Sequence, residues 1–121
     1  MRVLVLDDEP DLRDLLMVTF GLEAGCEVVG CAGTLQEGVE LARTTRPDVI
    51  VTDLVLGRPA PPEELLGELR HAAPTAAIVV FSGKDVPADA RPIGADAVLL
   101  KCGDLADLVE KVREVSSACG S

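Results

Sequence analysis

The stretch Pro47-Asp48-Val49-Ile50-Val51-Thr52-Asp53 sets the fold of this chain. It is a short, β-branched apolar run that leads to a single carboxylate. Three further apolar runs also stop at polar residues, the first at Asp7 and Asp8, the second at Ser82 and the third at Lys101. Runs this short and apolar are typical of parallel strands that helices cover on both faces.

The polar residues at the ends of these runs indicate where the chemistry lies. In an open parallel sheet, ligands bind outside the carboxyl ends of the strands. We therefore expect Asp7, Asp8, Asp53, Ser82 and Lys101 to gather at one edge of the sheet, with Asp53 near the middle.

The composition limits the class of protein. The 121 residues fit one domain with a single core, which we place at residues 1–117, with 118–121 as a tail or the start of a linker. The net charge of −10 argues against direct binding of nucleic acid. The four cysteines lack zinc-ligand spacing, and no apolar run is long enough to span a bilayer, so we expect a soluble cytoplasmic protein with reduced thiols.

Strand and helix signals alternate along the chain, which predicts a doubly wound α/β domain of five strands and about five helices. A capping box begins at Thr34, and Asp104 is placed to cap the last helix. In the first helix we expect one inward face, made of Leu12, Leu15, Leu16 and Thr19. Two prolines between residues 83 and 94 predict a short or irregular fourth helix.

The three acids expected at one edge repel one another. Two unit charges about 4 Å apart interact by roughly 4 kcal/mol at an effective dielectric near 20, and Lys101 supplies only one positive charge. A hard divalent cation offsets the rest, and Mg²⁺ suits one or two carboxylates plus a phosphoryl group. Taken singly, each acid could equally cap a loop or a helix start.

Other chemistries lack their residues. The one histidine, His71, lies at the end of a helix and far from the strand ends, so no catalytic triad is available. No glycine-rich loop follows the first strand, which disfavours a dinucleotide site. Phosphoryl transfer to a carboxylate remains, with Asp53 as nucleophile and with Lys101 and Ser82 holding the phosphoryl group.

Three motifs together resemble a response-regulator receiver domain of two-component signalling: Leu6-Asp7-Asp8-Glu9-Pro10, the run from Pro47 to Leu54, and Gly94-Ala95-Asp96-Ala97-Val98-Leu99-Leu100-Lys101. The resemblance covers essentially the whole chain. It implies the flavodoxin-like receiver fold with strand order 2-1-3-4-5.

The resemblance also implies the roles of the phosphoryl-binding residues. Asp53 matches the phospho-acceptor, Ser82 the hydroxyl that moves onto the phosphoryl group, and Lys101 the lysine that pairs with it. The implied donor is the phosphohistidine of a sensor histidine kinase. Such a domain is a signalling element that promotes its own phosphotransfer and dephosphorylation, and is not an enzyme in the usual sense.

The implied cofactor is Mg²⁺. Asp8 matches a direct metal ligand together with Asp53, Asp7 matches the acid that holds a metal-bound water, and Val55 sits where the family supplies a backbone carbonyl. A downstream output domain or protein partner is implied, a homodimer is left open, and neither nucleic acid nor membrane is expected as a direct partner of this domain.

Details of sequence are similar to NarL or LuxR-type receivers, among them the run Val28-Val29-Gly30-Cys31-Ala32. One departure is Val98, which stands where the family usually has the aromatic residue of its switch. This departure and the irregular fourth helix favour an alternative, a pseudo-receiver that binds partners independently of phosphate. The intact set of acids, hydroxyl and lysine favours phosphorylation.

Overall fold

The computed structural model describes residues 1–54, 56, 61–82, 94–101 and 104–120. Its centre is a parallel sheet in the order β2-β1-β3-β4-β5, as the resemblance implied. β1 lies between β2 and β3, and pairs with β3 from Val3↔Val49 to Leu6↔Thr52. The strands are β1 (Arg2–Leu6), β2 (Glu27–Ala32), β3 (Val49–Thr52), β4 (Ala77–Ser82) and β5 (Ala97–Leu100).

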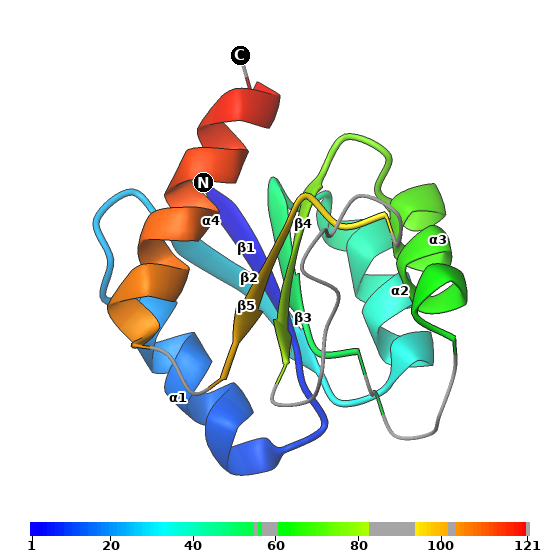
Figure 1. The fold of residues 1–121 in the computed structure, drawn as a ribbon, viewed down its shortest axis with the longest axis horizontal. Coiled ribbons are helices and arrows are strands. Elements are labelled where there is room, and N and C mark those ends of the chain that lie inside the picture. The colour runs from blue at the N-terminus through cyan, green and yellow to red at the C-terminus, as the bar shows by residue number, and fades with distance from the viewer. Residues whose placement is uncertain (55, 57–60, 83–93, 102–103, 121) are drawn as a thin grey trace.

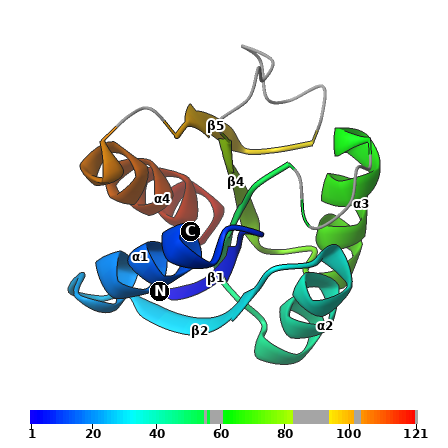
Figure 2. The same ribbon diagram turned by 90° about the horizontal axis from the view of Figure 1, so that it is seen from below.

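Helices cover both faces of the sheet (Figure 1). Seen along the strands, α1 and α4 lie on one side and α2 and α3 on the other (Figure 2). None of the helices among the described residues is long and apolar enough to cross a bilayer. The helices are α1 (Pro10–Gly21), α2 (Leu35–Thr45), α3 (Pro62–Ala72) and α4 (Leu105–Gly120).

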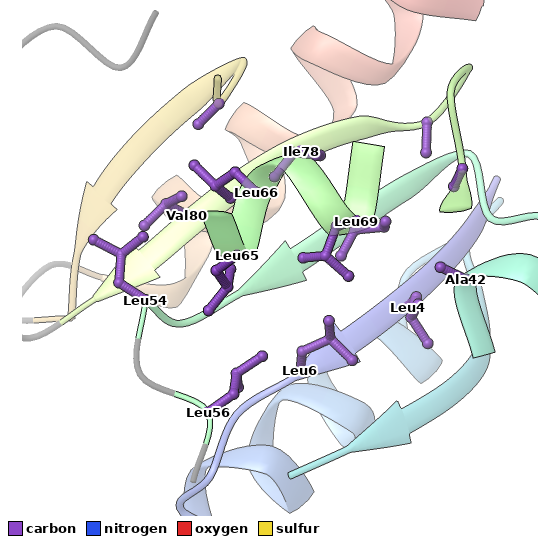
Figure 3. Packing of buried hydrophobic residues seen from close by; sticks show 14 of the residues in the cluster. Leu4, Leu6, Ala42, Leu54, Leu56, Leu65, Leu66, Leu69, Ile78 and Val80 are labelled. Carbon is purple, nitrogen blue, oxygen red and sulfur yellow. The ribbon is translucent and has the colours of Figure 1, made fainter. Parts of the chain in front are cut away.

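The alternation of side chains along each strand divides the core in two. In β1, Leu4 and Leu6 face α2 and α3, while Val3 and Val5 face α1 and α4. Figure 3 shows the first of these layers, in which residues of β1, β3 and β4 meet the leucines of α3. Burial on both faces explains why the strands are almost wholly apolar up to their last residue.

The predicted caps are present. The Glu37 amide donates to the Thr34 hydroxyl oxygen (3.2 Å) at the start of α2, and the Ala106 amide donates to Asp104 Oδ1 (3.0 Å) at the start of α4. The reciprocal half of the expected capping box differs, because the Glu37 carboxylate accepts from the Thr34 hydroxyl (3.2 Å), and no described hydrogen bond joins it to the Thr34 amide.

The predicted inward face of α1 is wrong at Leu15. The buried residues of α1 are Leu16 and Phe20, whereas Leu15 is 49% exposed. Leu12, Leu16 and Phe20 recur every four residues, so the buried stripe follows them and turns away from Leu15.

Two other expectations fall outside the described residues. The irregular fourth helix was expected between residues 83 and 94 and so falls largely outside them, as does Val55. The domain boundary expected at residue 117 stays a prediction, and α4 itself runs from Leu105 to Gly120.

Candidate functional site

The backbone fixes the candidate residues at the carboxyl edge of the sheet. Asp7 and Asp53 follow β1 and β3 directly, and their amides continue the ladder, donating to Ala32 O and Leu6 O (3.0 Å each). Ser82 is the last residue of β4, and its carbonyl accepts from the Lys101 amide at 2.9 Å. Asp7, Asp53 and Lys101 therefore extend β1, β3 and β5 by one residue each.

Three carboxylates converge at this edge. Asp7, Asp8 and Asp53 each have an oxygen within 4.8 Å of the others. Asp7 and Asp53 are buried, while Asp8 is exposed. A set of carboxylate oxygens, two of them buried, is the kind of donor set that a hard divalent cation such as Mg²⁺ takes, so the residues present fit the expected metal.

Lys101 lies among these acids. Its Nζ donates to Asp53 Oδ2 at 2.7 Å and lies 3.0 Å from Asp7 Oδ2 and 3.7 Å from Glu9 Oε1. Burial by itself lowers the pKa of the Lys101 ammonium, but the hydrogen bonds and charges of Asp53 and Asp7 outweigh burial and leave the pKa raised. Lys101 is therefore fully protonated at neutral pH.

Burial disfavours the charged form of the Asp7 carboxyl. Burial raises the pKa of the Asp7 carboxyl, against the opposing effects of the Glu9 amide, which donates to Asp7 Oδ1 at 2.9 Å, and of Lys101. The negative charge of Asp53 raises the pKa of Asp7 further. The one lysine does not fully offset the desolvation of Asp7.

Both carboxylate oxygens of Asp53 are held by hydrogen bonds. Oδ2 accepts from Lys101, and Oδ1 accepts from the Leu54 amide at 2.7 Å. The Thr52 hydroxyl donates to the Asp53 carbonyl at 2.8 Å. The carboxylate is thus fixed in orientation at the edge of the sheet.

Some contacts of the site had no signal in the sequence. Arg13 of α1 donates from Nη1 to the Asp7 carbonyl at 2.9 Å and so holds the loop that carries the acids. A Cβ at Gly33 would lie 2.5 Å from the same nitrogen, so the glycine leaves room for this arginine. Neither residue belongs to a motif that marks it in advance.

The structure therefore brings Asp7, Asp8, Asp53 and Lys101 together, with Ser82 buried at the adjoining strand end. Val55 lies outside the described residues. Val98 is partly buried on β5 and packs against the core layer under α2 and α3.

Comparison with known proteins agrees with this arrangement. The family model of the response regulator receiver domain matches residues 3–113. The chain is 34% identical over 117 residues to the transcriptional regulatory protein PdtaR of Mycobacterium tuberculosis strain H37Rv, covering 92% of this chain and 54% of the relative. It is 33% identical over 119 residues to the nitrate/nitrite response regulator protein NarL of Escherichia coli strain K12, covering 95% and 54%.

Solved structures show the same likeness. A LuxR-family two-component response regulator from Aurantimonas sp. SI85-9A1 superposes with a TM-score of 0.86 at 28% identity, covering 97% of this chain and 85% of that one. The receiver domain of the putative response regulator NarL from Mycobacterium tuberculosis gives a TM-score of 0.83 at 27% identity, covering 96% and 95%. The chain spans about half the length of the curated relatives it matches.

Proposed function

Because this chain belongs to the response regulator receiver domain family, we propose that Asp53 is its phospho-acceptor and that the donor is the phosphohistidine of a sensor histidine kinase. One observation carries the proposal. The Asp53 carboxylate is buried beside two further acids, and Lys101 Nζ lies 2.7 Å from one of its oxygens. Such a buried, oriented carboxylate with a cation in contact is suited to act as a nucleophile toward phosphorus.

Phosphoryl transfer from the phosphohistidine to Asp53 needs no further reactant. A carboxylate oxygen of Asp53 forms a bond to phosphorus, and the bond between phosphorus and the histidine nitrogen breaks, its electron pair remaining on that nitrogen. Lys101, already protonated and in contact with Asp53, faces the charge on the phosphoryl oxygens. We assign the Ser82 hydroxyl to the same phosphoryl group, from its place at the end of β4 and from the family resemblance.

The proposed cofactor is Mg²⁺, held by the carboxylates of Asp8 and Asp53, with Asp7 acting through water. The backbone carbonyl proposed from Val55 completes the set by resemblance alone. When bound, the ion supplies positive charge that offsets the acids and the phosphoryl oxygens. The surplus of carboxylates over lysine at this edge supports this assignment.

The proposed output is a switch. A phosphoryl group adds roughly two negative charges beside Lys101 and Ser82, and the contacts of Lys101 with Asp53 and Asp7 must rearrange to accommodate it. The alternative is a pseudo-receiver, and Val98 is the residue that favours it. The convergence of the acids and the lysine favours phosphorylation.

Mass spectrometry after treatment with acetyl phosphate tests the acceptor. We expect one added phosphoryl group in the presence of Mg²⁺ and none in EDTA. Asp53→Asn should abolish the addition, and the exposed Asp11→Asn variant should retain it. Labelling of the Asp53→Asn protein would place the acceptor elsewhere, and an unlabelled wild-type chain would support the pseudo-receiver.

The kinase needs a docking surface near Asp53, and α1 offers one. Leu15 and Val18 on this helix are 49% and 58% exposed, Leu22 just after it is 83% exposed, and α1 begins three residues after Asp7. Exposed apolar patches mark interaction sites. We propose that the kinase covers this patch.

The double variant Leu15→Gln and Val18→Gln tests the docking surface. Surface substitutions of this kind change stability by about 0.5 kcal/mol or less. We expect phosphotransfer from the sensor kinase to slow by roughly tenfold or more, while labelling by acetyl phosphate stays unchanged. Equal transfer rates for the variant and the wild type would refute the assignment.

We extend the proposal to the output partner and to the location in the cell. The curated relatives extend well beyond the matched region, so we propose an output domain or a separate protein as the reader of the switch. The net charge of −10 supports an output that does not use this domain to contact nucleic acid. We also propose a cytoplasmic location, where such kinases present their phosphohistidine.

A further inference from the structure

A furrow runs between α2 and α3, on the side of the sheet that does not carry α1. Near the carboxyl edge it opens into a hollow of about 600 Å³, whose lining includes Leu35, Val39 and Leu56. A second hollow of about 360 Å³ continues from it and shares Val39, Arg43 and Glu68. The two hollows therefore form one continuous depression along the seam of the helices.

The lining of this furrow combines an apolar floor with an acidic rim. Leu56 is buried, and Leu35 and Val39 are partly buried. On α3, Glu63, Glu64 and Glu68 are exposed along the opposite wall. Arg43 also lines the furrow, but its guanidinium pairs with Glu40 at 3.5 Å. His71 also lines the second hollow, and the three glutamates still leave the described lining with a negative formal charge.

No ion pair among the described residues involves Glu63, Glu64 or Glu68. Glu64 and Glu68 are four residues apart on one helix, a spacing at which like charges destabilise the helix by roughly 0.2–0.5 kcal/mol. Glu63 and Glu64 lie in the first turn of α3, where the helix dipole favours acidic side chains. Glu68 lies beyond that turn, and no described cation pairs with it.

Gly67, also on α3, is a second residue that lowers the stability of this helix. Glycine inside a helix costs about 1 kcal/mol relative to alanine. A Cβ at Gly67 would meet no atom within 4 Å, so close packing within the chain does not require the glycine. Gly67 lines the second hollow and leaves it wider. Local choices that oppose stability are expected where a protein binds something.

We propose that the furrow between α2 and α3 docks a basic amphipathic helix of a partner protein. Its apolar residues enter over Val39 and beside Gly67, and its lysine or arginine side chains pair with Glu63, Glu64 and Glu68. Helices bind grooves in this manner, with an apolar stripe as anchor and rim charges setting orientation. The acidic rim excludes a nucleic acid or an anionic membrane as the occupant. The proposal does not depend on phosphorylation of Asp53.

The test uses a fluorescent 14-residue helical peptide of leucine and lysine at amphipathic spacing, titrated into the ¹⁵N-labelled chain. We expect amide shift changes to concentrate in α2 and α3. The variant Glu63→Gln/Glu64→Gln/Glu68→Gln should weaken binding by about tenfold or more. The matched control Asp107→Asn/Glu110→Gln/Glu114→Gln on α4 changes the net charge equally and should weaken binding less than about twofold.

A further variant separates the groove from a merely acidic surface. Gly67→Leu places an apolar side chain in the second hollow from a Cβ position that has no other atom within 4 Å, and we expect it to weaken binding by roughly fivefold or more. The ¹⁵N spectrum of the variant checks that it folds. Unchanged affinity of Gly67→Leu would overturn the proposed apolar entry. Equal losses in the two charge variants, or shifts spread over all acidic surfaces, would overturn the site itself.

Discussion

Two ionic clusters lie at opposite ends of the sheet, and they are built differently. At the amino end, Arg70 of α3 donates to the Ala76 carbonyl (2.7 Å), the Gly94 carbonyl (3.3 Å) and Asp96 Oδ2 (3.0 Å). The same oxygen of Asp96 accepts from the Ile78 amide at 2.7 Å. One cation meets one anion there, and backbone groups share the remaining hydrogen bonds.

At the carboxyl end, the negative charges outnumber the positive ones. One ammonium, from Lys101, faces two buried carboxylates, and the third acid, Asp8, lies beside them. The Arg70 cluster is complete within the chain and ties α3 to β4 and β5. The Lys101 cluster is short of positive charge, which is the condition expected of a site that takes up a cation. Three substitutions test this difference.

The largest effect is expected for Lys101→Met in metal-free buffer. Removing one partner of a buried ion pair leaves the acids uncompensated and costs roughly 3–5 kcal/mol. The pKa of Asp7, already raised by burial, should rise further. Because the pKa of Asp7 is higher in the folded state than in the unfolded state, the free energy of unfolding should fall as the pH rises through the folded-state pKa. It should recover as the pH falls toward 3.8, the ordinary pKa of this group.

Urea unfolding at several pH values measures this loss. Mg²⁺ should restore much of the stability of the Lys101→Met protein. The exposed pair of Lys111 and Glu114 offers the control, since Lys111→Met should change stability by less than about 1 kcal/mol. A metal-free variant as stable at pH 7 as the wild type would contradict the assigned charge balance.

A smaller effect is expected for Arg70→Ala. The change removes three hydrogen bonds of a half-exposed pair, and we expect a loss of about 2 kcal/mol. Because this cluster is complete without a ligand, Mg²⁺ should not recover the loss. Recovery with Mg²⁺ would show that the two clusters are coupled through the sheet.

The smallest effect is expected for Asp7→Asn, and its sign is opposite. Burial disfavours the charged form of Asp7, so a neutral amide should stabilise the metal-free protein by roughly 1 kcal/mol at neutral pH, a typical gain from one favourable substitution. The raised pKa lies above the ordinary value of 3.8, so the gain should vanish as pH falls below that value. Thermal unfolding at pH 7 and pH 3 measures it.

The same substitution in the Arg70 cluster serves as the comparison. Asp96→Asn weakens a pair that is already balanced, so it should lower stability at pH 7. If both changes to asparagine lower stability equally, the carboxyl end holds no surplus of negative charge.

The convergence of the acids and Lys101 could be predicted from the sequence because the position of each follows from the end of a strand, whereas their roles stay a prediction. Each apolar run stops at the sheet edge, so parallel pairing brings Asp7 level with Asp53 and places Ser82 one residue beyond that level on β4. The same logic put Lys101 beside them. The strand order came from the family resemblance, since alternation of strands and helices does not determine it.

The Arg70 cluster and Arg13 were not predicted, for a physical reason. Arg70 and Asp96 are 26 residues apart, and although Asp96 directly precedes β5, nothing in the sequence pairs it with an arginine of α3. Long arginine side chains reach backbone carbonyls that no sequence pattern marks. The inward face of α1 was misplaced because Phe20, one turn beyond Leu16, shifts the buried stripe away from Leu15.

The strands that carry the two halves of the acid site differ in their neighbours. Asp7 and Asp53 follow β1 and β3, each flanked by a strand on both sides, whereas Lys101 follows β5, which pairs with β4 alone at the border of the sheet. A border strand of four residues exchanges its amide protons through smaller openings than an interior strand does. We therefore expect local openings of β5 to release the counter-charge of the site while β1 and β3 still hold its anionic half in place.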